Sequence, residues 1–398
     1  MMVGEREARR PRLGRGRNRL RLATGLSVAL GLAVLAGCSS SGSGSAASGS
    51  AGGGSAASGS AAGNSSSGKT PVTFVISVRA LDNAYAVAWV NGAKGFAQQM
   101  GYPASSVKVL QSGANDQAQV TQLQTFLAST SGKVAIAVDP NSNAITQSIV
   151  QAVQRDPNAY VTIFWNKPAN LWPWNGYSHW VSFINFNGNT SGEKSAQVLF
   201  KQMDGKGGII ALQGILNDVP AQQRFAGLQA AVKATPGITL LQQQTANWDE
   251  TQAFNATKSL LAKYGSEVKG VWAANDEMAI GAQQALKDSN MSNIPVVSAS
   301  DSIPQVLQSI KAGTGIYAST NPDGYWDGSV GVALAYYAAT GKIDVNSLSH
   351  EQRAFYAQAT LVDSSNVSQL LASPSPSQYA ADWTPTGVFS RSTGAIQP

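Results

Sequence analysis

The chain has 398 residues and a formal net charge of +6, so a nucleic-acid partner has to be considered first. Residues 1–21 hold eight arginines and two glutamates, a surplus of six positive charges, and the rest of the chain is neutral. The positive net charge of the chain therefore belongs to residues 1–21 and does not indicate nucleic-acid binding by the folded part, and no nucleic-acid partner is expected.

Residues 1–37 are typical of a secretory signal peptide. The basic stretch is followed by sixteen uncharged residues, 22–37, which are fewer than the roughly 20 that a membrane-spanning helix needs. Arg9 and Arg10 leave both the general secretory and the twin-arginine route open. The segment ends in LAGC, which resembles the bacterial lipobox, so Cys38 is predicted to carry a lipid. It is the only cysteine, and no intrachain disulfide is expected.

Residues 38–70 are predicted to form a flexible tether behind this lipidated cysteine. Ser, Gly and Ala make up 29 of the 32 residues in 39–70, and such a segment cannot bury enough apolar surface to fold. We therefore expect a globular body, residues 71–398, held by a lipid anchor at the outer face of the cell membrane.

In this body, apolar strand-like runs alternate with helix-like runs. The expected strands are 72–78, 107–112, 134–139, 159–166, 207–214, 238–244, 268–276 and 294–300, and the expected helices are 84–101, 118–129, 144–156, 192–203, 223–237, 250–265 and 277–290. This alternation predicts an α/β fold of doubly wound parallel sheets covered by helices on both faces. The length exceeds one typical core, which predicts two domains. Ligands of such sheets bind at the carboxyl ends of the strands.

Four segments of the body share a family resemblance. They are LDNAYAVAWVNGAKGFAQQMGY (81–102), ALQGILNDVPAQQRFAGLQAAV (211–232), VWAANDEMAIGAQQAL (271–286) and NPDGYWDGSVGVALAYYAATGK (321–342). Over nearly all of residues 71–390 the body resembles the sugar-binding periplasmic proteins of the ribose/galactose type, which serve ABC importers. The resemblance implies two doubly wound parallel-sheet lobes, joined by three hinge crossings near residues 184–189, 319–323 and 355–366.

The resemblance also divides the body between the lobes. The N-terminal lobe is expected to comprise residues 71–186 and 321–356, and the C-terminal lobe residues 187–320 and 357–398, including the tail. The lobes of such proteins close on a ligand by hinge bending, and the protein is expected to act as a monomer.

Nine positions are implied as ligand-binding by their match to the family. They are Asn83, Tyr85, Trp165, Asn166, Gln222, Trp248, Asn275, Asp301 and Thr320. An aromatic ring stacks on the C–H face of a sugar, while amide and carboxylate groups bind hydroxyls. Asn83 could instead cap a helix, and Trp248 could belong to the core. Asp276, next to Asn275, is expected mainly to cap the following helix.

Departures from the family pattern point to a neutral ligand. Trp165 and Asn166 stand where relatives often carry Asp-Arg, and Gln222 stands where they often carry an arginine. Arg224 matches an arginine that is more often structural. Without these charges, hydrogen bonds to hydroxyls lack charge assistance, and the expected cleft is uncharged.

The stretch FWNKPANLWPWNGYSHW, residues 164–180, places four tryptophans in a loop rich in Pro and Asn. One interpretation makes the rings an aromatic wall over the ligand, and the other makes them a plug on the lobe's own surface. Trp165 is expected to contact the ligand. Both interpretations stay open for Trp172, Trp174 and Trp180. Lys167 and His179 could each bind an anionic group of the ligand, or each could be a solvated surface side chain.

The predicted function is the binding of a small neutral sugar or polyol and its delivery to an ABC permease and its ATPase. The alternative is a sensory binding protein that presents a sugar or furanosyl signal to a membrane receptor. No cofactor and no metal are expected, because the two histidines lie far apart and no catalytic motif occurs. A carboxylate-only glycosidase would require Asp276 and Asp301 to face one bond, and no enzyme activity is predicted.

Overall fold

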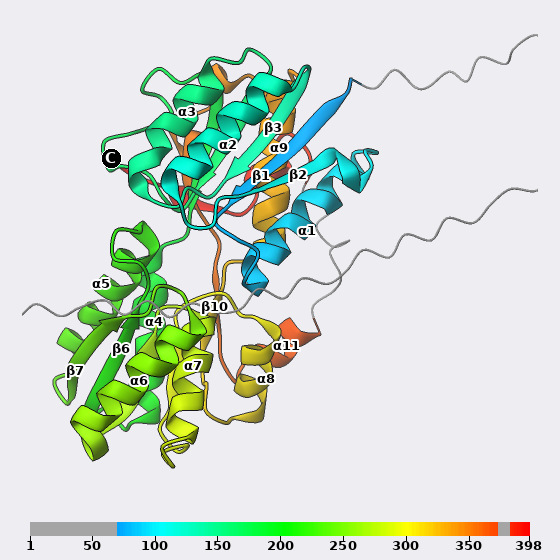
Figure 1. Cartoon of the computed structure of the whole chain (residues 1–398). Helices are drawn as coiled ribbons and strands as arrows, with labels where there is room; N and C mark the ends of the chain where they lie inside the picture. The colour runs from blue at the N-terminus through cyan, green and yellow to red at the C-terminus, as the bar shows by residue number, and fades with distance from the viewer. Residues whose placement is uncertain (1–69, 373–382) are drawn as a thin grey trace, which may run out of the picture. The chain divides into compact units, whose positions relative to one another are not determined.

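The computed structural model describes residues 70–372 and 383–398 (Figure 1). The predicted signal peptide, the lipid-bearing Cys38 and the tether up to residue 69 lie outside the described residues. Among the helices that are described, none is both long and apolar enough to cross a membrane.

The first sheet has seven strands in the order β13-β11-β5-β4-β3-β1-β2, all parallel except for β13. The strands are β1 (Val72–Val78), β2 (Val107–Gln111), β3 (Lys133–Val138), β4 (Ala159–Phe164), β5 (Trp180–Asn185), β11 (Ala354–Ala357) and β13 (Ser392–Ala395). The helices packed with it are α1 (Ala84–Gln99), α2 (Asp116–Ser129), α3 (Thr146–Gln154), α9 (Gly324–Ala339) and α10 (His350–Arg353). This sheet and its helices are called the first lobe.

Both faces of the first sheet are buried because successive side chains of a strand point to opposite sides. Phe74 and Ile76 of β1 belong to the core shared with α1 and α9, whereas Val75 belongs to the core shared with α2 and α3. Helices α1 and α9 approach so closely that a Cβ at Gly328 would lie 1.7 Å from the Trp89 carbonyl oxygen. Only glycine permits this contact.

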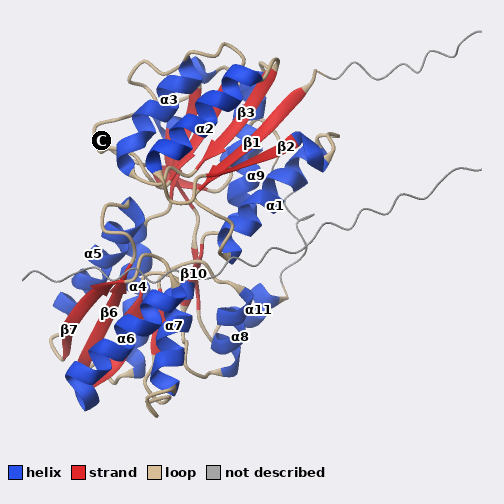
Figure 2. Ribbon diagram, viewed as in Figure 1, coloured by secondary structure: helices blue, strands red, loops and turns tan. Residues whose placement is uncertain are grey.

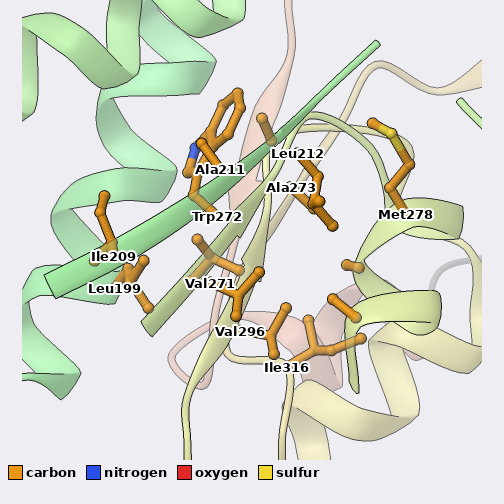
Figure 3. Packing of buried hydrophobic residues seen from close by; sticks show 14 of the residues in the cluster. Leu199, Ile209, Ala211, Leu212, Val271, Trp272, Ala273, Met278, Val296 and Ile316 are labelled. Carbon is orange, nitrogen blue, oxygen red and sulfur yellow. The ribbon is translucent and has the colours of Figure 1, made fainter. Parts of the chain in front are cut away.

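The second sheet has four parallel strands in the order β7-β6-β8-β9. Strands β6 and β7 are labelled in Figure 2. The strands are β6 (Gly207–Gln213), β7 (Ile238–Thr245), β8 (Val268–Ala273) and β9 (Val296–Ser298). The helices are α4 (Gly188–Gln202), α5 (Val219–Ala234), α6 (Glu250–Tyr264), α7 (Asp276–Lys287), α8 (Pro304–Ala312) and α11 (Val367–Leu371). Figure 3 shows side chains of its single core, among them Ile209 and Leu212 of β6 with Val271 of β8. This sheet and its helices are called the second lobe.

The chain passes between the two lobes three times. It leaves β5 for α4 through residues 186–187, returns from β10 (Ser319–Asn321) to α9, and leaves β11 for β12 (Thr360–Val362). Strands β10 and β12 pair with each other as an antiparallel ribbon. The predicted fold class, α/β with parallel sheets, is confirmed.

The C-terminal segment differs from the predicted domain boundaries. The sequence placed residues 357–398 with the second lobe, but β13 pairs with β11 in the first sheet. Trp383 is buried in the first lobe's core, where its ring lies edge-on to Phe96, and its carbonyl accepts a hydrogen bond from the Tyr337 hydroxyl. Burial of this indole and completion of the sheet edge hold residues 383–398 on the first lobe, so the prediction for them is wrong.

Candidate functional site

Tyr85, Trp165 and Asp327 form a linked group at the carboxyl end of the first sheet. The Trp165 Nε1 donates to the Tyr85 hydroxyl at 3.1 Å, and that hydroxyl donates to Asp327 Oδ2 at 2.6 Å. The two rings meet edge to face with centroids 6.1 Å apart. Burial is the largest cause that raises the pKa of Asp327 well above its ordinary value. The indole and phenol groups are thereby fixed as one aromatic wall.

Trp165 directly follows β4 with a left-handed backbone, φ +57°. Its ring is buried and tilts against Phe186 at a centroid distance of 5.0 Å. A non-glycine residue in this conformation costs energy that its surroundings must offset, and such residues gather at functional sites. The strained turn thus directs the indole of Trp165 toward Tyr85.

Trp248 lies after β7, at the carboxyl end of the second sheet, again with a left-handed backbone, φ +66°. Its Nε1 donates to Asp218 Oδ2 at 3.0 Å. A Cβ at Gly214 would lie 2.1 Å from the indole, so the ring lies directly on the glycine backbone after β6. The orientation of Trp248 therefore depends on Gly214 and Asp218.

Arg224 of α5 lies between the two indoles. Its guanidinium carbon is 5.4 Å from the Trp165 ring centroid and 5.5 Å from that of Trp248, and Nη1 donates to the Ala274 carbonyl at 2.9 Å. Arginine over an indole face is a favourable cation–π arrangement. The sequence indicated only a structural role for Arg224. The missed signal is its spacing, because Ala221, Arg224 and Leu228 share the buried side of α5.

Polar groups gather at the carboxyl ends of β8 and β9. Asn275 caps α7 through its Oδ1, which accepts from Met278 N at 3.1 Å, and its Nδ2 donates to Glu277 Oε2 at 2.6 Å. Burial, followed by the charge of Asp301, raises the pKa of Glu277. Asp301 has φ +109°, and its N–H donates to the Thr320 carbonyl at 2.8 Å. Asn275 and Asp301 thus follow the neighbouring strands β8 and β9 at one edge of the second sheet, and their binding of a ligand stays a prediction.

Asp276 anchors the neighbouring loop. Its carboxyl oxygens accept from the Ile303 N–H at 2.7 Å and from the Ser319 hydroxyl at 2.6 Å. The side chain is fully buried, and burial raises its pKa. Both oxygens are thus used to join α7 to the segments that carry Asp301 and Thr320.

Charged groups from both lobes meet beside this site. Arg79 follows β1, and its Nη2 lies 3.6 Å from Asp218 Oδ2 at the start of α5. Asp139 follows β3, and burial, then the charge of Asp218, raises its pKa to about 7. Burial raises the pKa of Asp218 to about 6. The expectation of an uncharged cleft is therefore wrong, because Arg79, Arg224, Asp139 and Asp218 all lie here.

Four predicted residues serve other contacts. Asn83 caps α1 by accepting from Ala86 N at 2.8 Å, as the alternative interpretation had it. Gln222 is exposed and donates to the Leu216 carbonyl. Asn166 is buried, and its Oδ1 accepts from Val219 N of the other lobe at 3.0 Å. Thr320 is buried and lines a cavity of about 210 Å³ together with α4 and the hinge segments.

The rest of the tryptophan loop packs on the first lobe itself. Trp172 stacks on Trp174 with centroids 5.0 Å apart, and Trp174 stacks on His350 at 4.2 Å. Lys167 lies 3.4 Å over the Trp172 ring, and burial lowers its pKa to about 8. Trp180 is a buried residue of β5. These contacts favour the surface-plug interpretation for Trp172, Trp174 and Trp180.

His179 also packs on the first lobe itself. Its ring stacks on Tyr160 at a centroid distance of 4.6 Å, and its Nδ1 lies 2.9 Å from the Ala159 carbonyl oxygen. Within residues 70–372 and 383–398, no cluster of three or more His, Cys, Asp and Glu side chains is suited to hold a metal ion.

The arrangement of polar and aromatic groups at strand ends agrees with the comparison to known families. A model described as a periplasmic binding protein domain matches residues 74–343. The chain belongs to this family. The matches place it among the sugar- and polyol-binding proteins of ABC transporters, whose members are binding proteins and act outside the cytoplasm.

Individual relatives support the assignment. A D-apiose import binding protein of Actinobacillus succinogenes is 30% identical over 290 residues, 73% of this chain and 87% of that protein. A xylitol-binding protein of Mycolicibacterium smegmatis is 34% identical over 145 residues, 36% of this chain and 41% of that protein. The crystal structure of a twin-arginine translocation pathway signal protein from Burkholderia phytofirmans has a TM-score of 0.76 at 35% identity and covers 82% of this chain and 98% of that one.

The buried carboxyl groups predict an unusual dependence of stability on pH. Their folded-state pKa values lie above the unfolded value of about 3.9, so from about pH 4 to pH 7 the folded protein holds protons that the unfolded chain has released. Stability is therefore greatest at the acid end of this window and falls as the pH rises, by about 1.4 kcal/mol per pH unit for each group that only the folded state keeps protonated.

Denaturant unfolding at pH 5 and pH 7.5 measures this difference. Asp139→Asn should make the fall less steep, because the amide cannot release a proton, whereas Asp218, Asp276 and Asp327 still can. A stability that rises from pH 5 to pH 7.5 in the wild-type protein would contradict the assignment of raised pKa values.

Proposed function

We propose that the protein captures a small neutral sugar or polyol between its two lobes and delivers it to an ABC import permease and its ATPase. The observation that carries this proposal is a set of shielded carboxyl oxygens in the segments that follow β3, β6 and β8. Asp139 Oδ1, Asp218 Oδ1 and Glu277 Oε1 have no hydrogen-bond partner in the described structure. Hydroxyl groups of a sugar would satisfy such atoms, since unpaired buried polar groups are costly.

The charge balance supports a neutral ligand. Burial raises the pKa of Asp276 to about 8 and that of Glu277 to about 9, which favours their protonated form near pH 7. The positive charges of Arg79 and Arg224 are offset by acidic side chains of the site, among them Asp218 beside Arg79. A protonated carboxyl group both donates and accepts, which suits hydroxyls.

The aromatic groups supply the apolar part of recognition. Trp165 and Tyr85 from the first lobe and Trp248 from the second can stack on C–H faces of a sugar or polyol, while Arg224, Asn275 and Asp301 bind hydroxyls. The relatives named for xylitol and D-apiose have ligands of this chemical class. No cofactor, metal or enzymatic step is part of the proposal.

A thermal-shift screen tests the ligand class. The panel contains pentoses, hexoses, furanosyl sugars, polyols such as xylitol, and sugar acids. A ligand that binds only the folded state raises the melting temperature by mass action. A shift with a neutral sugar or polyol is the expected result, whereas a shift only with sugar acids would overturn the proposal of a neutral ligand.

Delivery to a permease separates transport from the sensory alternative. With the ligand found in the screen, the protein should stimulate ATP hydrolysis by its cognate ABC permease in proteoliposomes. Stimulation of a membrane receptor without effect on the ATPase would instead establish the sensory function.

We also propose that Cys38 anchors the protein to the outer face of the membrane after export. Cys38→Ser should release the protein into the soluble fraction and leave ligand affinity unchanged, because the tether separates the anchor from the lobes. Retention of the variant in the membrane fraction would contradict lipid attachment at Cys38.

A further inference from the structure

Five helices of the second lobe each end with a lysine. The last turn of α4, α5, α6, α7 and α8 contains one lysine each, and these are Lys201, Lys233, Lys263, Lys287 and Lys311. All five residues are exposed. In the first lobe, the last turns of α1, α2, α3 and α9 contain no basic residue. Lysine at the helix ends is therefore a feature of one lobe.

The topology brings these lysines to one end of the second lobe. Each of the helices α5, α6 and α7 links two parallel strands of the sheet, so it starts at the carboxyl ends of the strands and ends at their amino ends. Helix α4 ends just before β6 starts, and α8 is followed by Ile316, which pairs with Val296 at the start of β9. The candidate ligand site lies at the opposite ends of these strands.

Two further exposed lysines belong to the same surface. Lys206 directly precedes β6, and Lys269 is the second residue of β8. A Cβ at Gly207, the first residue of β6, would lie 2.9 Å from Lys269 Cγ, so the two strand starts and their lysines are neighbours. The five lysines of the helix ends, with Lys206 and Lys269, are called the basic end.

Few negative charges offset the basic end. The acidic side chains in the same connecting segments are Asp204, Glu267 and Asp288. Among the residues that the structure describes, the only ion pairs are formed by Arg79 and Arg391, so no lysine of the basic end is paired. Residues 22–398 carry as many acidic as basic side chains, so the basic end is a local separation of charge within a neutral body.

The helix dipole alone does not account for this surface. A lysine at a helix C-terminus is favourable at any one helix, yet four long helices of the first lobe lack it, and Lys206 and Lys269 lie outside the helices. Exposed and unpaired charges of one sign attract a surface of the opposite sign. The basic end is therefore suited to an anionic partner.

The proposed lipid anchor brings such a surface within reach. Residues 39–69 join Cys38 to the described body, and a chain of this length spans at most about 110 Å. The body of an anchored molecule is thus confined to a layer beside the membrane, where a high effective concentration strengthens a weak contact. Lysines near a membrane that contains anionic lipids are attracted to its headgroups.

We propose that the basic end binds anionic phospholipid headgroups of the membrane that carries the protein; the nearness of that membrane rests on the proposed anchor at Cys38. The contact is electrostatic and reversible, because the exposed large apolar side chains of the described residues, Val87 and Leu216, lie outside the basic end. It engages the amino ends of the strands, so the candidate ligand site at their carboxyl ends stays uncovered.

Site-resolved acetylation of lysines on vesicles tests this contact. Because Cys38 is the only cysteine, the full chain is coupled through it to a maleimide lipid, whether or not cells lipidate it. The vesicles consist of phosphatidylcholine alone, or of phosphatidylcholine and phosphatidylglycerol in equal amounts. On the anionic vesicles, trace acetylation read by mass spectrometry should be several-fold slower at Lys233, Lys263 and Lys287, and high salt should remove the difference. Lys108 and Lys342, exposed in the first lobe, should react equally on both.

Removal of charge from either lobe separates a defined surface from the charge of the whole molecule. Lys201→Gln, Lys233→Gln and Lys263→Gln together should restore rapid acetylation of Lys287, because each lost lysine weakens membrane binding by about fivefold. The matched control replaces the exposed first-lobe residues Arg155, Lys108 and Lys342 by glutamine. It removes the same number of charges and should leave Lys287 protected.

Equal acetylation of the basic end on both kinds of vesicle would overturn the proposal. So would a slowing that extends equally to Lys108 and Lys342, or one that persists in high salt or in the triple variant of the basic end. The coupling at Cys38 is chemical and no sugar is added, so failure of this test is distinguishable from failure of lipidation in cells and from a failed ligand screen.

Discussion

Replacement of Trp248 by alanine should weaken ligand binding by about 1–3 kcal/mol, roughly 5- to 150-fold in Kd. The indole lies on the Gly214 backbone, is held by Asp218, and faces the guanidinium of Arg224. Its removal deletes the apolar face that the second lobe offers to a sugar. Isothermal titration with the ligand found by thermal shift measures the loss.

Trp174→Ala is the matched control for this prediction. Trp174 is a half-buried indole of the same size, but it stacks on Trp172 and His350 away from the cleft. Its removal should leave Kd unchanged. Equal affinities of wild type and Trp248→Ala would remove Trp248 from the binding site, and a loss confined to Trp174→Ala would restore the tryptophan loop as the ligand wall.

Most of the fold could be predicted because its elements have strong periodic patterns. The run Val72–Val78 is a strand in sequence and in structure, and the helix expected at 84–101 spans Ala84–Gln99. The last strand, Ser392–Ala395, has no such pattern, because STGA contains no alternation of apolar and polar residues. It is a strand because its backbone pairs with β11, and the local sequence does not contain this information.

Some residues of the candidate site could be predicted and others could not, because the sequence does not show how the two lobes meet. Trp165 and Asn275 were recognised because they match family positions at the ends of predicted strands, where ligands of parallel sheets bind. Arg79 and Asp139 follow β1 and β3 in the same way, but a charged residue at a strand end is equally common at the surface. Whether such a charge faces solvent or a second lobe depends on how the lobes meet.

Asn166 shows the same limit of sequence-based prediction for a single side chain. The sequence shows an amide at the end of a strand, a type of residue that binds hydroxyls. Its acceptor atom is instead occupied by Val219, which lies 53 residues further along the chain in the other lobe. Position along one strand predicts that a side chain lies at the cleft, but it does not predict which partner the side chain finds there.

Arg353→Ala should lower the free energy of unfolding by about 3–5 kcal/mol, because this one side chain fastens the tryptophan loop. Its Nη2 donates to the carbonyls of Pro173, Tyr177 and Trp180 at 2.7–2.8 Å. The side chain is buried, and burial lowers its pKa to about 10, so it stays charged near neutral pH. Hydrogen bonds to a charged group each contribute about 1.5–3 kcal/mol, and their loss leaves the carbonyls of the loop without partners.

Denaturant unfolding measures this loss, with two matched controls. Arg353→Lys should fall between wild type and alanine, because one ammonium group reaches fewer of the carbonyls than the planar guanidinium. Arg155→Ala, at an exposed arginine, should change stability by no more than about 0.5 kcal/mol. Since the loop beyond Lys167 packs on its own lobe, ligand affinity of folded Arg353→Ala should match wild type. A variant with normal stability and weakened ligand binding would contradict this account and assign the loop to the ligand site.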